Sequence, residues 1–120
     1  MDAPGPSKTA LELGKEIRRR RLEAKLTQRE LASEVGVSFP HISKIEAGHD
    51  VPSDDLLRRI AKATRSNADQ LTMVARRIPA DLTDLVLKKR DLAPQFLRSW
   101  KRGEIRDEEI RKLLERARRR

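Results

Sequence analysis

The sequence predicts an all-helical protein, in which a five-helix unit is followed by a short C-terminal helical appendage. Apolar residues recur three or four positions apart along most of the chain, as they do on one face of an α-helix. No stretch alternates apolar and polar residues with the period of two that marks a β-strand. Serine, threonine or asparagine precedes several apolar stretches, and glycine follows two of them. These residues are preferred where helices begin and end.

Length and charge favour a small binding module over an enzyme. A chain of 120 residues can bury one modest helical core, but not an elaborate active-site cleft. Its 28 Lys and Arg residues outnumber its 19 Asp and Glu residues, which gives a formal net charge of +9. This charge favours DNA, RNA or an anionic membrane surface as partner. The chain has no phosphate-binding glycine loop, metalloprotease motif or serine-nucleophile motif, so we expect no catalysis.

The content of cysteine and histidine argues against a metal site. The sequence contains no cysteine, which excludes disulfides and thiolate ligands. Its two histidines, His41 and His49, stand eight positions apart and have no recognisable set of further ligands around them. We therefore expect neither a metal nor another cofactor.

The first nine residues are expected to form a flexible lead-in. Pro4, Gly5 and Pro6 oppose regular structure, and the segment lacks the basic-then-apolar layout of a signal peptide. No apolar stretch of the chain approaches the roughly 20 residues that span a bilayer. We expect a cytoplasmic, nucleoid-associated protein with no membrane partner.

The five-helix unit is expected to cover residues 10–77. Its first helix spans about residues 10–25. Thr27 and Glu30 are three positions apart and form a capping-box pattern at the start of the second helix, which ends at Gly36, because glycine adopts a positive φ without steric cost. The predicted inward-facing positions of the five helices are Leu13, Ile17, Ala24, Leu31, Ala32, Val35, Ile42, Ile45, Leu56, Ile60, Ala63, Ala68, Leu71 and Val74.

The remaining helices of this unit follow the same start and stop signals. Ser38 is the predicted N-cap of the third helix, with Pro40 in its first turn, where the missing N–H of proline costs nothing. Gly48 closes that helix. Ser53 caps the fourth helix, and the fifth begins near residues 66–67.

The second and third helices carry the strongest functional signal. Two short helices around a glycine turn allow one helix to brace across a phosphate backbone while the next enters the major groove. The stretch LTQRELASEVGVSFPHISKIEAG, followed by VPSDDLLRRIAKAT, resembles the lambda-repressor-like helix-turn-helix class, also called the xenobiotic-response-element family. The resemblance covers about residues 11–75.

This resemblance implies a sequence-specific transcriptional regulator that binds double-stranded DNA, most simply a repressor that occludes a promoter as a homodimer. Whether it represses or activates depends on where its operator lies, so that choice stays open. A second function is also open, because transcriptional coactivators that resemble this family use the same fold as protein-interaction adaptors.

The resemblance also implies which residues contact DNA. Gln28, at the start of the bracing helix, is expected to hold a phosphate together with the helix amides. On the recognition helix, Phe39 is expected to pack on a thymine methyl, Ser43 to bond to bases, and Lys44 to reach a guanine edge or a phosphate. Packing against the core is the alternative for Phe39. The expected DNA contacts are Thr27, Gln28, Ser38, Phe39, Pro40, His41, Ser43, Lys44 and His49.

Charged residues of the first helix are expected to play two roles. Arg21 and Glu46 match a pair that bridges the first and third helices in the family, so we interpret them as a structural ion pair. Arginines 18–20 are expected to form a solvated face beside Glu16 and Glu23, with one of the three on a phosphate.

Residues 78–120 are expected to form three short helices, which begin near Asp81, Pro94 and Asp107. Forty residues bury little apolar surface alone. We therefore predict a subunit-pairing region whose seam contains Ile110, Leu113 and Leu114, with Trp100 as a further candidate. Dimers of this class present two recognition helices about one DNA turn apart. An intramolecular lid, or a contact for an antirepressor or protease partner, is the alternative.

Overall fold

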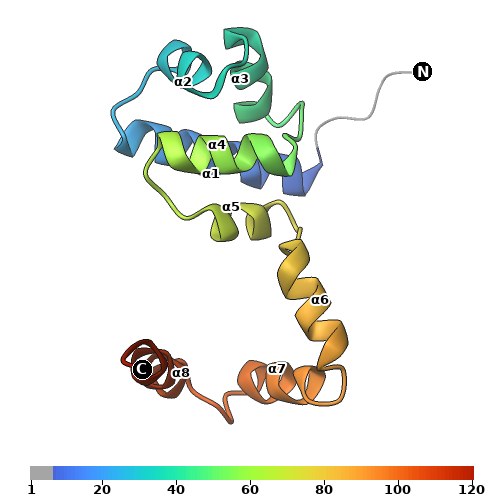
Figure 1. The fold of residues 1–120 in the computed structure, drawn as a ribbon. Helices are drawn as coiled ribbons and strands as arrows, with labels where there is room; N and C mark the ends of the chain where they lie inside the picture. The colour runs from blue at the N-terminus through green and yellow to red at the C-terminus, as the bar shows by residue number, and fades with distance from the viewer. Residues whose placement is uncertain (1–6) are drawn as a thin grey trace, which may run out of the picture. The chain divides into compact units, whose positions relative to one another are not determined.

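The computed structural model describes residues 7–120, and all regular structure in this range is α-helical (Figure 1). The all-helical prediction is therefore confirmed. No helix in the described range is long and apolar enough to cross a membrane. The helices are α1 (Lys8–Glu23), α2 (Gln28–Val35), α3 (Phe39–Glu46), α4 (Asp54–Ala63), α5 (Ala68–Val74), α6 (Ala80–Lys88), α7 (Ala93–Lys101) and α8 (Asp107–Arg118).

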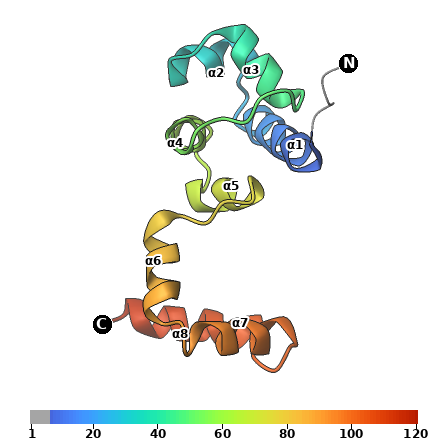
Figure 2. The same ribbon diagram turned by 90° about the vertical axis from the view of Figure 1, so that its right-hand side faces the viewer.

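The chain divides between Pro79 and Ala80 into two compact units, which hold α1–α5 and α6–α8. In the first unit, α1 and α4 form the middle layer (Figures 1 and 2). On one side of this layer α3 packs against α1 and α2 packs against α4, and on the other side α5 packs against both. The buried apolar cluster consists of Leu13, Ile17, Leu31, Ala32, Val35, Ile42, Ile45, Leu56, Leu57, Ile60, Ala61, Leu71 and Ala75.

The cap residues that the sequence predicts form the helix ends. The hydroxyl of Thr27 accepts a hydrogen bond from the Glu30 amide, and the Glu30 carboxylate accepts one from the Thr27 amide, which completes the capping box. The hydroxyls of Ser38 and Ser53 accept hydrogen bonds from the His41 and Leu56 amides and so cap α3 and α4. Gly36 lies in the left-handed region with φ of 75°, so the chain turns directly from α2 into α3.

The first helix starts earlier than predicted. The hydroxyl of Ser7 accepts a hydrogen bond from the Ala10 amide at 3.1 Å, and α1 begins at Lys8. The prediction of a flexible lead-in is therefore wrong for residues 7–9, because Ser7 forms the N-cap and compensates the free amides of the first turn. The rest of that prediction, over residues 1–6, lies outside the described residues.

The prediction that Arg20 belongs to a solvated face is also wrong. Arg20 is buried, and its Nη1 donates to Ser66 Oγ at 2.9 Å and to the Asn67 carbonyl at 3.0 Å. Its Nε donates to Glu16 at 2.9 Å. The five donors of a guanidinium allow it to satisfy several acceptors at once, so Arg20 ties α1 to the turn between α4 and α5.

Gly14 allows α1 and α3 to cross closely. A Cβ atom at this position would lie 2.5 Å from the Glu46 carbonyl oxygen and 2.6 Å from that of Ile45. Glycine within a helix costs about 0.5–1 kcal/mol relative to alanine. The close crossing is a physical reason for accepting that cost, because a methyl group would push the last turn of α3 away from α1.

The second unit contains few enclosed contacts. None of the side chains of α6, α7 and α8 is buried. The rings of Phe96 and Trp100 lie with their centroids 6.1 Å apart, and the indole nitrogen of Trp100 donates to Asp107 Oδ1 at 2.6 Å. This hydrogen bond joins α7 to the first residue of α8.

Candidate nucleic-acid interface

A nearly buried ion pair joins α1 to the last residue of α3. Arg21 Nε donates to Glu46 Oε2 at 2.7 Å, and Arg21 Nη2 donates to Glu46 Oε1 at 2.9 Å. The two side chains are 9% and 3% exposed. Arg21 Nη1 also donates to the Leu26 carbonyl at 2.9 Å, so the same guanidinium fixes the turn between α1 and α2. Bidentate geometry of this kind fixes orientation as well as distance.

The start of α2 joins this ion pair through Gln28. Gln28 is half-buried, and its Nε2 donates to Glu46 Oε1 at 3.1 Å. The sequence predicts Gln28 at the start of the bracing helix, and the structure adds this bond to α3. The carboxylate of Glu46 thereby sets the position of α3 relative to both α1 and the first turn of α2.

A shallow groove of about 450 Å³ opens beside this ion pair. Arg18, Gln28, Ser43 and Ala47 line it together with the two members of the pair. Two of the expected DNA contacts, Gln28 and Ser43, are brought together here with Arg18. Arg18 is exposed, and it is thus the residue of the predicted 18–20 group best placed to meet an anion in the groove.

Beyond the groove, α3 exposes its first turn and one later position. Ser38, Pro40 and Lys44 are exposed, whereas Ser43 is half-buried. The hydroxyl of Ser38 accepts a hydrogen bond from the amide of residue 41 at 3.3 Å, so its oxygen already has one partner. The outer surface of α3 is therefore polar and open, while its inner positions Ile42 and Ile45 belong to the core.

The two histidines lie at opposite ends of α3. His41 is half-buried in the first turn, and its Nε2 lies 3.1 Å from Asp50 Oδ2. His49 follows the helix and is exposed. Between residues 7 and 120, no group of three or more His, Cys, Asp or Glu side chains is placed to hold a metal ion.

Phe39 packs inward and also supports an arginine. It is half-buried and contacts the core cluster, as in the packing alternative that the sequence left open. Arg29, from α2, lies over its ring with Cζ 4.4 Å from the ring centroid. Arg29 is absent from the residues predicted for this face, because nothing in the local pattern shows that a residue ten positions before Phe39 will cover its ring.

The remaining expected contact, Thr27, is occupied by the capping box. The pKa of the Glu30 carboxyl lies below its ordinary value, because the backbone N–H of Thr27, and to a smaller extent its hydroxyl, stabilise the ionised form. The stabilisation from this cap is therefore complete above the ordinary pKa of a glutamate and is lost as the pH falls through the lowered value. The Glu30 carboxylate is thus engaged by the N-cap residue of its own helix.

Most arginines of the first unit are neutralised by a nearby carboxylate. Those with ion pairs are Arg19, Arg20, Arg21, Arg58, Arg59, Arg76 and Arg77. Within the described part of this unit, Arg18, Arg29 and Arg65 form no ion pair. Two of these three, Arg18 and Arg29, lie beside the first turn of α2 or the start of α3, where an anionic ligand would find uncompensated positive charge.

This arrangement agrees with a family match. Residues 17–71 match a helix-turn-helix family model, which spans the helices that carry the ion pair, the glycine turn and the exposed face of α3. This unit is a lambda-repressor-like helix-turn-helix domain. The resemblance inferred from the sequence is therefore confirmed.

Relatives of the helix-turn-helix domain include two uncharacterized HTH-type transcriptional regulators of Mycobacterium tuberculosis, MT0491 and Rv0474. Each is 45% identical over 58 residues, which cover 48% of this chain and 41% of the relative. The matched segment thus spans less than half the length of these relatives.

Two crystal structures of the clp gene regulator ClgR from Corynebacterium glutamicum are also similar. One is 27% identical with a TM-score of 0.52, and the match covers 58% of this chain and 91% of that chain. The other is 26% identical with a TM-score of 0.53, and the match covers 79% and 97% of the two chains.

We predict that Arg21→Met lowers the free energy of unfolding by about 3–5 kcal/mol, because it leaves the buried Glu46 carboxylate without its charged partner. Urea denaturation measures the loss. Arg19→Met is the matched control, since Arg19 lies on the same helix but pairs with carboxylates at the exposed surface, where ion pairs contribute little. Similar stability losses in the two variants would contradict a special role for Arg21.

The double variant Arg21→Met/Glu46→Leu should regain much of that stability, because it removes both buried charges. It should not regain all of it, since the Leu26 carbonyl and the Gln28 amide each lose a partner.

Proposed function

We propose that the protein is a sequence-specific DNA-binding transcriptional regulator, most simply a repressor that occupies operator DNA as a homodimer. The observation that carries the proposal is the fixed position of α3. Its inner face is packed, its last residue is tied to α1 and α2 by the Arg21–Glu46 pair, and its outer face is open. A helix held in this way presents its outer side chains as a rigid set, which suits reading of the major groove.

The charge distribution supports a polyanionic ligand at this face. The chain carries a formal net charge of +9, and Arg18, Arg29 and the exposed Lys44 are free of carboxylate partners in the described structure. Because DNA carries closely spaced phosphates, uncompensated Lys and Arg side chains supply much of the affinity for it. The names of the relatives, as HTH-type transcriptional regulators and a clp gene regulator, point to the same class of function.

In this proposal, some residues of the DNA-binding face contact the phosphate backbone and others contact base edges. Gln28 and the first amides of α2, with Arg18 across the groove, hold a phosphate. Ser43 and Lys44 meet base edges, and Lys44 is the more exposed of the two. The other expected contacts, Thr27, Ser38, Pro40, His41 and His49, lie around this face and contribute shape or phosphate contacts.

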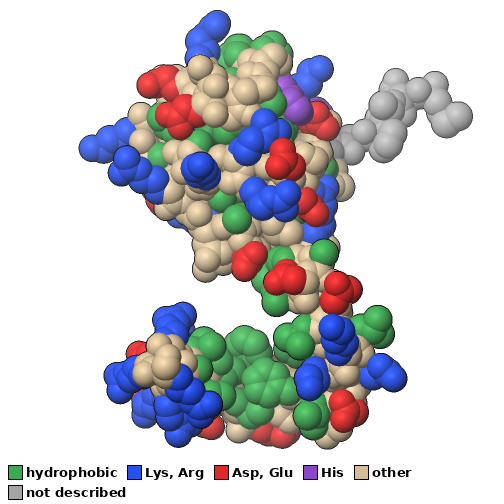
Figure 3. All heavy atoms as spheres, viewed as in Figure 1, with side chains coloured by type: hydrophobic (Ala, Val, Ile, Leu, Met, Phe, Trp, Pro, Cys, Tyr) green, Lys and Arg blue, Asp and Glu red, His purple; other side chains and the backbone are tan. Residues whose placement is uncertain are grey.

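The second unit supports the homodimer, because it exposes a large share of its apolar side chains. Figure 3 shows hydrophobic side chains gathered over α7, with Lys and Arg side chains around α8. The exposed large apolar residues of this unit are Leu82, Leu85, Val86, Leu87, Leu92, Phe96, Leu97, Trp100, Leu113 and Leu114. Contiguous apolar surface of this kind usually marks an interaction site.

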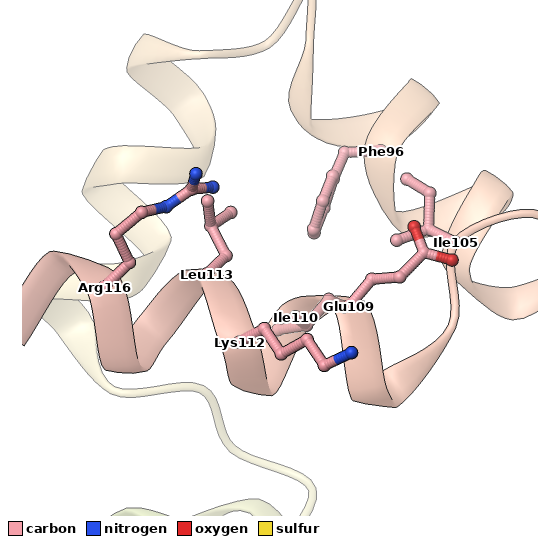
Figure 4. A pocket seen from close by; sticks show the side chains of 7 residues that line it. All are labelled: Phe96, Ile105, Glu109, Ile110, Lys112, Leu113 and Arg116. Atoms are coloured by element: carbon pink, nitrogen blue, oxygen red, sulfur yellow. The ribbon is translucent and has the colours of Figure 1, made fainter.

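A groove in this unit supports the proposed seam, because two of the expected seam residues line it. It measures about 680 Å³ and is lined by Phe96, Ile105, Glu109, Ile110, Lys112, Leu113 and Arg116 (Figure 4). Leu113 lies on α8 and Phe96 on α7, so one substitution at Leu113 changes the apolar wall of the groove. In the proposal a second copy of the chain covers this surface.

Selection of bound duplexes from a random pool is the experiment that tests the proposed function. Enrichment of one palindromic sequence, with two half-sites about one helical turn apart, is the expected result. Binding without any enriched sequence, or no binding at physiological salt, would contradict the proposal. That result would favour the alternative function, a protein-interaction adaptor or coactivator built on the same helical fold.

We predict that Lys44→Ala weakens binding to the selected site by about 1–3 kcal/mol and weakens nonspecific binding far less, because a base contact carries sequence information. Gln28→Ala should weaken binding to all duplexes alike, because a phosphate contact carries none and the two bonds from Arg21 still hold Glu46 in place. Fluorescence anisotropy with the selected duplex and a scrambled one measures both effects. A changed base preference in Gln28→Ala, or equal losses for Lys44→Ala on the two duplexes, would contradict these assignments.

For the seam, we predict that Leu113→Glu and Leu113→Lys both convert a dimer into a monomer, because each places a charge on the apolar wall. Sedimentation equilibrium measures the change. Both variants should also show a shallower dependence of log affinity on log salt for a two-half-site duplex, by about 0.9 for each phosphate that the protein no longer neutralises. The two charges have opposite direct effects on DNA affinity, so a weakening common to both variants reports subunit pairing. A wild-type protein that stays monomeric at tens of micromolar would refute the seam.

A further inference from the structure

The cation–π pair of Arg29 and Phe39 links the first turn of α2 to the start of α3. Arg29 is the second residue of α2 and is exposed, and Phe39 is the first residue of α3 and is half-buried. The guanidinium carbon of Arg29 lies 4.4 Å from the centroid of the Phe39 ring. An arginine within about 6 Å of a ring centroid is attracted to the ring face, so the two side chains form one unit.

The positive charge of Arg29 has no carboxylate partner in the described structure. Arg29 forms no ion pair there, in contrast to Arg19, Arg20 and Arg21 of α1. The adjacent carboxylate, Glu30, is engaged by the Thr27 amide in the capping box. No hydrogen bond or ion pair engages the Arg29 guanidinium within the described residues, so its N–H donors stay available to a ligand.

Phe39 restrains the position of the Arg29 guanidinium. Its ring packs against the core cluster beneath α2 and α3, so the surface that carries Arg29 belongs to the rigid part of the domain. A free arginine loses considerable side-chain entropy when it binds, and one already held in place loses less. The position is also tied to the first turn of α3, which is the part of a recognition helix that meets base edges.

We propose that Arg29 and Phe39 form a single base-reading unit, in which Arg29 donates two hydrogen bonds to O6 and N7 of a guanine and Phe39 holds the guanidinium in the required orientation. The inference rests on the proposed function and deepens it, since it names a specificity-determining residue on α2. Arginine bidentate to guanine is the commonest specific contact in the major groove. Phe39 is then a positioning residue, which accounts for an aromatic side chain at a helix position expected to read bases.

The test compares the base preference of the wild type, three test variants and one control variant. Fluorescence anisotropy measures their binding to the duplex selected by the wild type and to its single-base-pair variants. The wild type should prefer one G·C pair by about 10-fold or more over the alternatives at that position. Arg29→Met should lose this preference. Arg29→Lys should lose most of it despite keeping the charge, because an ammonium lacks the planar fork. Phe39→Leu should lose much of it while keeping apolar contact with the core.

Arg65→Met is the matched control, because Arg65, just after α4, is also without an ion pair in the described structure and its replacement removes the same charge. It should keep the full preference of the wild type. Thermal unfolding by circular dichroism should show that Arg29→Met and Arg29→Lys remain folded. Because these surface variants test the guanine contact without disturbing Phe39, the inference stays testable even if Phe39→Leu unfolds.

Four results would overturn the inference. Equal weakening of all duplexes by Arg29→Met would make Arg29 a phosphate contact. An unchanged preference in a folded Phe39→Leu variant would remove the positioning role of the ring. A wild type that enriches no sequence would overturn both this inference and the proposed function. If the wild type enriches a site but Arg29→Met keeps every base preference, the inference alone would be overturned.

Discussion

The carboxylate of Glu46 is the point on which the geometry of the first unit depends. It accepts two hydrogen bonds from Arg21 of α1 and one from Gln28 of α2, so one side chain at the end of α3 fixes three helices. Gly14 adds a second constraint, since its missing side chain lets α1 approach the Ile45 and Glu46 carbonyls. Together they determine how far α3 stands out from the domain and at what angle.

A buried ion pair is a weak source of stability, because desolvation of both charges offsets most of their attraction. Its value here is positional. α3 has eight residues, and isolated helices of that length are marginal in water, so its order comes from packing of Ile42 and Ile45 and from the fixed end at Glu46. A helix that is anchored at its last turn and capped at Ser38 can keep its outer face polar and free for a ligand.

Local rules account for what the sequence predicts well. The helix starts and the turn between α2 and α3 depend on residues only a few positions apart, so the sequence alone predicts them. They lie at Thr27, Ser38, Ser53 and Gly36. The Arg21–Glu46 bond spans 25 positions, and only the resemblance to a known family revealed it. The expected roles of the α3 residues in DNA binding remain proposals, because they concern a partner outside the chain.

Features created by contacts across the fold escape such rules. Arg20 stands in a run of arginines that looks solvated, yet it is buried because acceptors from the α4–α5 turn reach it. Arg29 covers Phe39 because α2 and α3 meet at their first turns, which no local spacing records. Gly14 could have been suspected, since an isolated glycine in a helical stretch often marks a close approach, but its partner could not be named.

NMR mapping of the free and DNA-bound protein, with isotope-labelled full-length chain and the selected duplex, tests most directly whether the fixed α3 face is the binding surface. We expect the largest amide shifts within residues 27–30 and 38–44, while the amides of α5 stay nearly unchanged. Largest shifts on α5 or within residues 80–120, with those of α3 unaffected, would contradict it.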